Sequence, residues 1–152
     1  MEVDEFGALS TVGVARIIDI SDEKNPLVIS NLRLEVHQPE NFDTIKDDPG
    51  ASSTGYGSYA AHFCNVPRRV DPTIVACSMI MSGLRIFDIR DPYHPREVAY
   101  FNAPVQNGAL ATGPPSNGAF SSPAFAPERK EIWYTDSSSG FYAVRVTNDA
   151  WP

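Results

Sequence analysis

Short apolar segments alternate with clusters of Gly, Pro, Asp and Ser along the whole chain. The segments are rich in β-branched and aromatic residues, which is typical of strands. One of them carries apolar residues on both of its alternating faces, with Leu84 and Ile86 on one face and Phe87 and Ile89 on the other. A sheet with one face in solvent would alternate apolar and polar residues instead. The pattern therefore predicts an all-β protein whose sheets are stacked face to face.

One apolar pattern occurs twice in the chain. Residues 15–22 read ARIIDISD and residues 84–91 read LRIFDIRD, and each segment is followed by a proline four residues later. A weaker third copy, GFYAVRV, covers residues 140–146, where Arg145 stands in place of the aspartate. Internal repetition of this kind indicates like structural units along the chain.

The middle unit is predicted to contain four strands, at about residues 61–66, 73–79, 84–89 and 97–102. Four-stranded antiparallel sheets that repeat along a chain are the blades of β-propellers. The first unit supplies about three strands, and the last unit ends after its third strand. The sequence therefore predicts a partial propeller of about two and a half blades.

The whole chain, residues 1–152, is predicted to be one β-propeller fragment. Its blades are expected at about residues 3–36, 60–102 and 120–149, and long loops between blades at residues 37–59 and 103–121. A propeller ring typically has 4–8 blades. The remaining blades are therefore expected from a longer parent chain or from self-assembly.

Residues 83–92 (GLRIFDIRDP), followed by Pro95, resemble the repeat of LVIVD-type β-propeller proteins. Residues 14–22 with Pro26 are a second, looser match. The segment 59–102 is similar to members found in bacterial exported or cell-surface proteins. The resemblance implies a propeller fold and an extracellular or cell-surface location. It implies no reaction, because no shared catalytic motif can be carried over to residues of this chain.

The formal net charge is −7, from 19 Asp and Glu against 12 Lys and Arg. This balance argues against a nucleic-acid partner, since phosphate binding needs a positive surface. No transmembrane segment is predicted, because the longest nearly apolar stretch, residues 73–81, is far shorter than the ~20 residues that span a bilayer. Residues 1–5 are acidic where a signal peptide would be basic. The chain as given is expected in the cytoplasm, whereas an export signal upstream would place it outside the cell.

Cys64 and Cys77 lie at equal distances from the centre of a predicted turn at residues 68–72. If this turn closes a symmetric hairpin, the two cysteines face each other across adjacent strands. Directly opposed Cβ atoms lie ~4.5–5.5 Å apart, slightly beyond comfortable disulfide geometry. Two alternatives therefore stay open: a cross-strand disulfide in an exported protein, and two small buried thiols.

His62 falls on the predicted innermost strand of the middle blade, where side chains line the axial channel of a propeller. Together with His37 and the carboxylates of Asp43, Asp47 or Asp48, it has the donor atoms of a metal site. No ligand pair has a diagnostic spacing, so neither a metal nor another cofactor is predicted. The alternative for His62 is a hydrogen-bonded core or channel residue.

Tyr56 and Tyr59 lie between Gly, Ser and Ala residues in the first predicted long loop. Aromatic side chains in adaptable loops are well suited to binding a partner. We therefore expect these two residues to contribute to a recognition surface.

Asp19 and Asp88 occupy equivalent positions of the two strong repeats, between apolar neighbours. A buried carboxylate of this kind usually accepts hydrogen bonds from a neighbouring turn or pairs with a base, here Arg16 or Arg85. Because a catalytic site is needed only once, the repetition favours an architectural role.

These features predict a non-enzymatic binding or scaffolding module that recognises protein or carbohydrate through its inter-blade loops. The alternative is part of a propeller enzyme with a metal or acid/base site in the central channel, to which His62 and His37 would contribute. The fold alone does not separate the two, since propellers serve both purposes.

Overall fold

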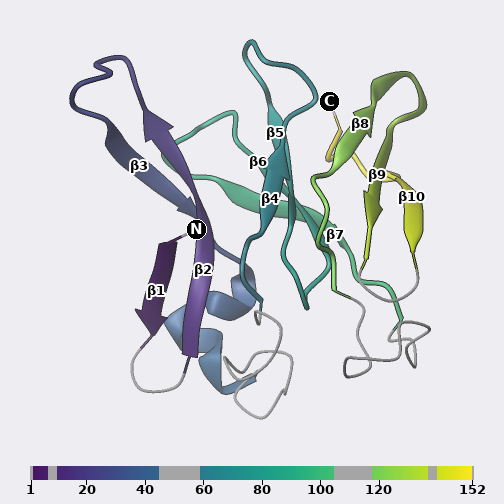
Figure 1. Cartoon of the computed structure of the whole chain (residues 1–152), viewed down its shortest axis with the longest axis horizontal. Coiled ribbons are helices and arrows are strands. Elements are labelled where there is room, and N and C mark those ends of the chain that lie inside the picture. The colour runs from purple at the N-terminus through teal and green to yellow at the C-terminus, as the bar shows by residue number, and fades with distance from the viewer. Residues whose placement is uncertain (1, 7–9, 45–58, 105–117, 137–139, 152) are drawn as a thin grey trace.

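The computed structural model describes residues 2–6, 10–44, 59–104, 118–136 and 140–151. Within these ranges the chain is all-β, with ten strands, three short 3-10 helices and no α-helix. The strands form three antiparallel sheets (Figure 1). No helix in the described ranges is long and apolar enough to cross a bilayer.

The first sheet has the order β1-β2-β3. Its strands are β1 (Glu2–Phe6), β2 (Ser10–Asp19) and β3 (Leu27–Leu32). Two 3-10 helices follow, η1 (Glu35–His37) and η2 (Pro39–Thr44). The three strands agree with the number that the sequence predicts for the first unit.

The middle sheet has the order β4-β5-β6-β7. Its strands are β4 (Phe63–Asn65), β5 (Ile74–Ser78), β6 (Leu84–Asp88) and β7 (Arg96–Phe101). The four strands predicted for this unit are confirmed, each within a few residues of its expected bounds.

The last sheet has the order β10-β9-β8. Its strands are β8 (Ala124–Ala126), β9 (Glu131–Thr135) and β10 (Phe141–Arg145), and η3 (Pro127–Arg129) joins the first two. β10 ends at Arg145, which stands in place of the repeated aspartate.

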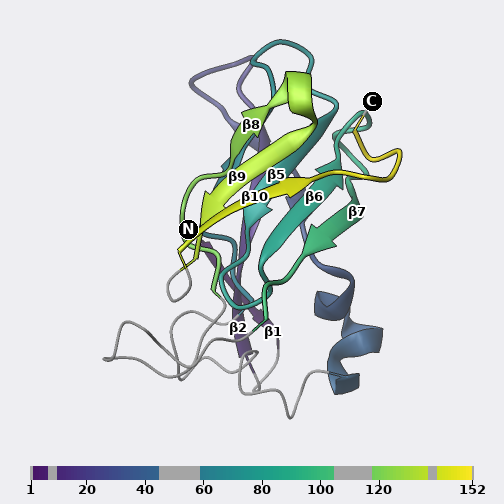
Figure 2. The ribbon, with the colours of Figure 1, turned by 90° about the vertical axis from the view of Figure 1, so that its right-hand side faces the viewer.

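The middle sheet is packed between the other two (Figures 1 and 2). The first interface, between the first and middle sheets, buries Leu32, Leu34, Ala61, Val75, Cys77, Met79 and Phe87. The second interface, between the middle and last sheets, buries Ile74, Ala76, Leu84, Ile86, Ala119, Ile132, Tyr134 and Trp151. All five residues of β5 are buried. The expectation of sheets stacked face to face is therefore confirmed for the described residues.

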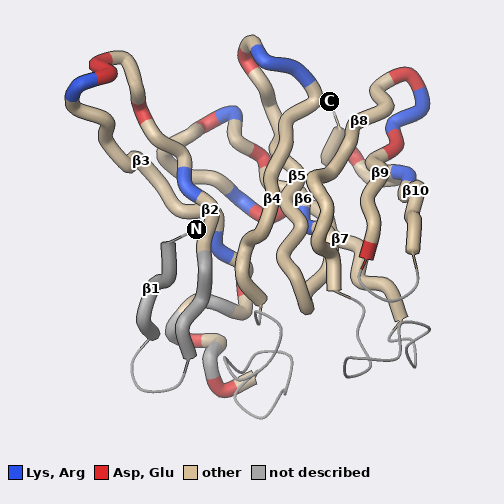
Figure 3. The backbone as a smooth tube through the Cα atoms, viewed as in Figure 1, with Lys and Arg blue, Asp and Glu red and all other residues tan. Residues whose placement is uncertain are grey.

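Charged residues gather in the turns at the upper end of Figure 3, between β2 and β3, β4 and β5, and β8 and β9. The central strand β5 carries no charged residue. Because β5 carries no charge, both of its faces stay available for apolar packing.

The hairpins β2–β3 and β6–β7 share an irregularity as well as a sequence pattern. The pairing shifts by one residue between Ile17 and Ile18 in the first hairpin, and between Ile86 and Phe87 in the second. These positions are equivalent in the two repeats, and the two hairpins lie in different sheets. A β-bulge increases the local twist of a strand, so the two hairpins twist at the same point.

The turns that follow β2 and β6 share one hydrogen-bond pattern. In each turn an aspartate accepts a hydrogen bond from the backbone N–H two residues later, and its second oxygen contacts the side chain three residues later. The contacts are Asp22 with Lys24 (3.0 Å) and Asn25 (2.8 Å), and Asp91 with Tyr93 (3.0 Å) and His94 (2.9 Å). The side-chain contacts with Asn25 and His94 hold the pKa of both carboxyl groups below its usual range.

Phe87 and Ile18 occupy equivalent positions of the two hairpins, but Phe87 is 1% exposed and Ile18 is 48% exposed. We expect Phe87→Ala to lower the free energy of unfolding by about 3–5 kcal/mol, because it leaves a cavity in the first interface. Ile18→Ala is the matched control, and it should lower the free energy of unfolding by less than about 1 kcal/mol because Ile18 is exposed. Urea denaturation measures both values, and equal losses would contradict the tight packing of the first interface.

Candidate functional site

His62 lies directly before β4, at the edge of the middle sheet, and its side chain is exposed. Its backbone N–H donates to the carbonyl of Ser78 (2.8 Å), which extends the pairing of β4 with β5. Its Nδ1 atom lies 2.7 Å from the carbonyl oxygen of Phe120, in the segment that leads to the last sheet. Because a carbonyl only accepts hydrogen bonds, this contact assigns the proton to Nδ1. In the neutral ring, Nε2 therefore presents its lone pair as an acceptor.

Two phenyl rings pack around the imidazole of His62. The ring centroids of Phe63 and Phe120 lie 4.3 and 5.6 Å from that of His62, both in edge-to-face geometry. Phe63 is 48% exposed and Phe120 is half-buried. These three residues, the His62 group, combine exposed aromatic surface with one hydrogen-bond acceptor. This combination gives a ligand both apolar contact and orientation.

His62 precedes β4, and Phe120 precedes β8, so the His62 group joins the two segments that lead into the middle and last sheets.

Of the other predicted binding residues, the structure describes the backbone of His37 and the side chain of Tyr59. His37 is the last residue of η1, which follows the first sheet. Tyr59 is half-buried and packs against the first interface, so part of its ring supports the packing of the sheets. Tyr56, Asp47 and Asp48 lie outside the described residues. In the part of the chain that is described, no three His, Cys, Asp or Glu side chains are arranged to hold a metal ion.

Cys64 and Cys77 are paired directly across β4 and β5, and the structure joins them in a disulfide. Their Cα atoms lie 4.0 Å apart. This is closer than the ~4.5 Å between the Cα atoms of an ordinary non-hydrogen-bonded pair. The two strands therefore approach each other closely enough at this point for the two sulfur atoms to bond. Cys64 is exposed, and Cys77 is fully buried in the first interface.

The carboxylate of Asp88 is held by its own turn. It accepts a hydrogen bond from the backbone N–H of Arg90 (3.0 Å) and further hydrogen bonds from the guanidinium of the same residue. These contacts lower the pKa of Asp88 to about 2. Asp19 repeats the backbone contact, with the N–H of Ser21 at 2.8 Å.

Of the two alternatives that the sequence leaves open for Asp88, hydrogen bonding within its turn is the one that the structure shows, and pairing with Arg85 is not. Arg85 instead forms an ion pair with Glu97 (2.7 Å), and both side chains are 15% exposed. Residues three apart on a strand point to opposite faces of the sheet, and this places the Arg85 side chain away from Asp88. The architectural role expected for Asp88 agrees with its contacts.

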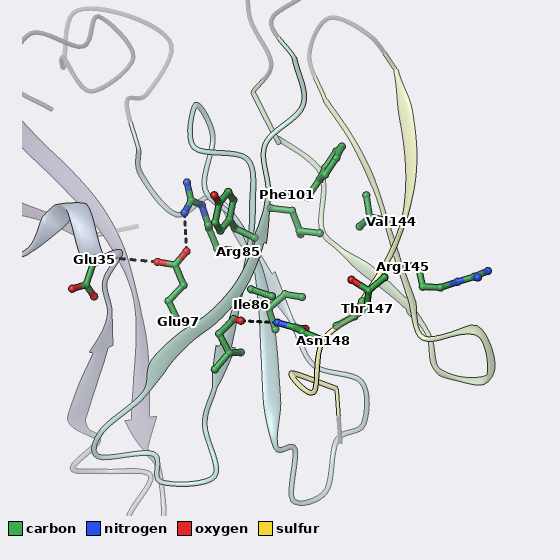
Figure 4. Close-up of a pocket in the computed structure, with 14 residues that line it drawn as sticks. Glu35, Arg85, Ile86, Glu97, Phe101, Val144, Arg145, Thr147 and Asn148 are labelled. Atoms are coloured by element: carbon green, nitrogen blue, oxygen red, sulfur yellow. Dashed lines mark hydrogen bonds and ion pairs between the residues drawn. The ribbon is translucent and has the colours of Figure 1, made fainter. Parts of the chain in front are cut away.

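A groove of about 750 Å³ lies between β7 and β10 (Figure 4). Phe101 and Val98 line it from the middle sheet, Val144 lines it from β10, and Asn148 lines it from the segment after β10. The Nδ2 atom of Asn148 donates to the carbonyl of Val98 (3.0 Å) across the groove. No local sequence pattern predicts this groove, because its walls come from different sheets.

The chain matches no known family model, and no curated protein is significantly similar to it.

The disulfide encloses a short segment, with a sequence separation of 13 residues. Cross-links of this size stabilise a fold by about 3 kcal/mol, mainly by restricting the unfolded chain. We expect the double variant Cys64→Ala/Cys77→Ala to lower the free energy of unfolding by about 2–4 kcal/mol. Denaturant unfolding measures the loss, and the reduced wild-type protein is the control. Two free thiols in the mass of the purified protein would contradict the pairing.

Asp88 should make the stability of the protein depend on acid pH. Its pKa is about 2 in the folded protein, below the ~3.9 of an unfolded chain. Its stabilising effect is therefore complete above about pH 4 and is lost as the pH falls toward 2. Asp88→Asn should flatten the curve of urea midpoint against pH between 5 and 2. Arg90→Gln should flatten it too, since Arg90 is the main cause of the shift; curves parallel to wild type would contradict the assignment.

Proposed function

We propose that the chain is a non-enzymatic binding module that recognises protein or carbohydrate at the His62 group and through the two long connections that end beside it. The observation that carries this proposal is the exposed side chain of His62, whose Nδ1 contacts the carbonyl of Phe120 and whose ring packs against Phe63 and Phe120. An apolar sugar face or an aromatic side chain stacks on the exposed ring of Phe63. A hydroxyl or amide of the same ligand donates to Nε2.

We also propose that the three sheets are successive blades of an LVIVD-type β-propeller, about two and a half in number. Three observations support this: the shared strand register and bulge of β2–β3 and β6–β7, the shared aspartate turns, and the burial of both faces of the middle sheet. The remaining blades come from a longer parent chain or from self-assembly.

The proposed location is extracellular or at a bacterial cell surface. The disulfide between Cys64 and Cys77 supports it, since such bonds form and persist mainly in oxidising compartments. The sequence resemblance to exported proteins points the same way.

The alternative, part of a propeller enzyme, needs ligating or acid/base side chains around His62. Among the described residues, its imidazole contacts two phenyl rings and a carbonyl oxygen. These groups are suited to orient a ligand, and they support the binding proposal.

Titration of labelled protein with neutral hexasaccharides and with short Tyr- or Trp-containing peptides tests the binding proposal by NMR. A bound probe should shift the signals of His62 and Phe63, and Phe63→Ala should weaken binding about tenfold, as at other aromatic contact points.

Two substitutions of His62 separate binding from folding. The amide of His62→Asn still donates to the carbonyl of Phe120, so the melting temperature should hold while binding weakens. His62→Ala should lower both the melting temperature and the affinity for the probe. Shifts confined to other surfaces, no shift with any probe, or chemical conversion of a probe would each overturn the proposal.

A further inference from the structure

One exposed segment of the middle sheet is tied to the core mainly by the disulfide. Residues 62–73, which include β4, contain no buried residue, whereas Ala61 and Ile74 at the two ends are buried. All three residues of β4 are exposed. Segments with few buried apolar contacts open most easily in a folded protein. The bond from Cys64 to Cys77 is the covalent link between this segment and the buried strand β5.

The other contacts of this segment are not covalent. Val66 is half-buried against the first interface, and Asn65 donates to the carbonyl of Pro123 (2.9 Å). The backbone of β4 pairs with β5 on one side only, because β4 is the edge strand of its sheet. In a propeller this edge borders the central channel, so further blades would leave it unpaired. Without the disulfide, these few contacts alone would hold β4 in place.

The two sulfur atoms of the disulfide differ in access. Cys64 is exposed, whereas Cys77 is 0% exposed in the first interface. Thiol–disulfide exchange starts when a thiolate attacks one of the two sulfur atoms, so access selects the atom that is attacked. The attack is therefore directed to the Sγ atom of Cys64, and the Sγ atom of Cys77 is the leaving group.

A dithiol reductant completes the exchange in two steps. In the first step its thiolate bonds to Sγ of Cys64, the S–S bond breaks, and Sγ of Cys77 keeps the electron pair and takes up a proton. In the second step the other thiolate of the reductant attacks the reductant's own sulfur in the mixed disulfide, and Sγ of Cys64 leaves and is protonated. The reductant becomes a disulfide and gives up two protons, which the two cysteines receive. The thiol of Cys77 then remains as a small apolar group in the first interface.

The exchange site is next to the His62 group. Cys64 directly follows Phe63 and lies two residues after His62. The contact of Nδ1 of His62 with the carbonyl of Phe120 (2.7 Å) requires that this end of β4 keep its place relative to the segment before β8. The closed disulfide fixes β4 on β5 and so preserves this contact. Once the disulfide is open, β4 is free to leave β5 and to carry the imidazole away from Phe120.

We propose that Cys64 is an exchange site for a dithiol reductant, and that this exchange switches the His62 group from an ordered form that binds ligand to a mobile form that does not. The exchange and the change in order follow from the contacts of β4. The effect on ligand binding rests on the function proposed above. In an oxidising compartment the bond persists and the group is ordered, and a dithiol opens it.

A monothiol traps the first step and identifies the attacked sulfur atom. Folded wild-type protein is treated with glutathione, quenched with acid and mapped by peptide mass spectrometry. The adduct should lie on Cys64 rather than Cys77 by about ten to one or more. In urea both cysteines should be modified about equally, because access no longer differs. An equal distribution in the folded protein, an adduct mainly on Cys77, or a disulfide that resists a large excess of thiol would each overturn the proposal.

NMR of the oxidised protein and of the protein reduced by a small dithiol tests the change in order. The signals of Phe87 and Ile132, one in each interface, should keep their positions. Those of residues 62–66 should shift, and their amides should exchange about tenfold or more faster than in the oxidised form. In the reduced sample they should also exchange faster than the amides of Phe87 and Ile132. Unchanged signals of residues 62–66 would overturn the proposal. So would loss of the core signals, since the bond would then hold the whole fold.

Ligand binding is compared in the oxidised, reduced and reoxidised protein, with the hexasaccharide or aromatic peptide that shifts the signals of His62. Reduction should weaken binding about tenfold, as loss of one aromatic contact point does, and reoxidation should restore it. The control Cys64→Ala/Cys77→Ala should bind as weakly as the reduced protein and should not respond to dithiol.

The binding measurements separate the two proposals. A probe that binds the oxidised and reduced forms equally would overturn the switch and leave the binding function standing. If no probe binds either form, the proposed function fails, while the trapping and NMR measurements still decide whether exchange at Cys64 releases residues 62–66.

Discussion

The burial of both faces of the middle sheet is the constraint on which the rest of the structure depends. Every residue of β5 is buried, and its side chains point alternately into the first and second interfaces. A sheet of this composition is stable only with a neighbour on each side. Burial also requires a partner for each polar atom; the hydroxyl of Ser78 donates to the carbonyl of Ser121 (2.6 Å).

Side chains that bond to irregular backbone of a neighbouring sheet give the stack a fixed orientation. Ser30 of β3 donates to the carbonyl of Pro92 (2.6 Å), in the turn after β6, and Asn65 of β4 donates to Pro123 (2.9 Å), before β8. Apolar packing has no direction of its own, whereas each of these hydrogen bonds has one favourable geometry. Sliding one sheet along another would leave several carbonyls without a partner. His62 belongs to this class of contact, through its Nδ1 atom and the carbonyl of Phe120.

Local pattern predicted the strands well, because apolar alternation and turn residues act within a few positions of the chain. The opposition of Cys64 and Cys77 followed from the symmetry of one hairpin. The bulge between Ile86 and Phe87 has no sequence mark of its own, and it depends on how the whole hairpin twists over its neighbours. The sequence left two alternatives open for Asp88 for a related reason, since the partner of Arg85, Asp88 or Glu97, depends on which face of β6 each side chain takes. The groove beside β10 forms only where the middle and last sheets pack together, so no local pattern predicts it.

The same constraint explains why the candidate surfaces lie at sheet edges. The faces of the middle sheet are used for packing, so backbone and polar groups remain available mainly beside β4 and along β10. An open strand edge also invites pairing with another copy of the chain, and charged side chains along the edge oppose this. Arg145 and Arg129 place positive charge at that point, where both pair with the carboxylate of Glu131. Like charges on two β10 edges repel each other, so this cluster opposes the pairing of two copies along β10.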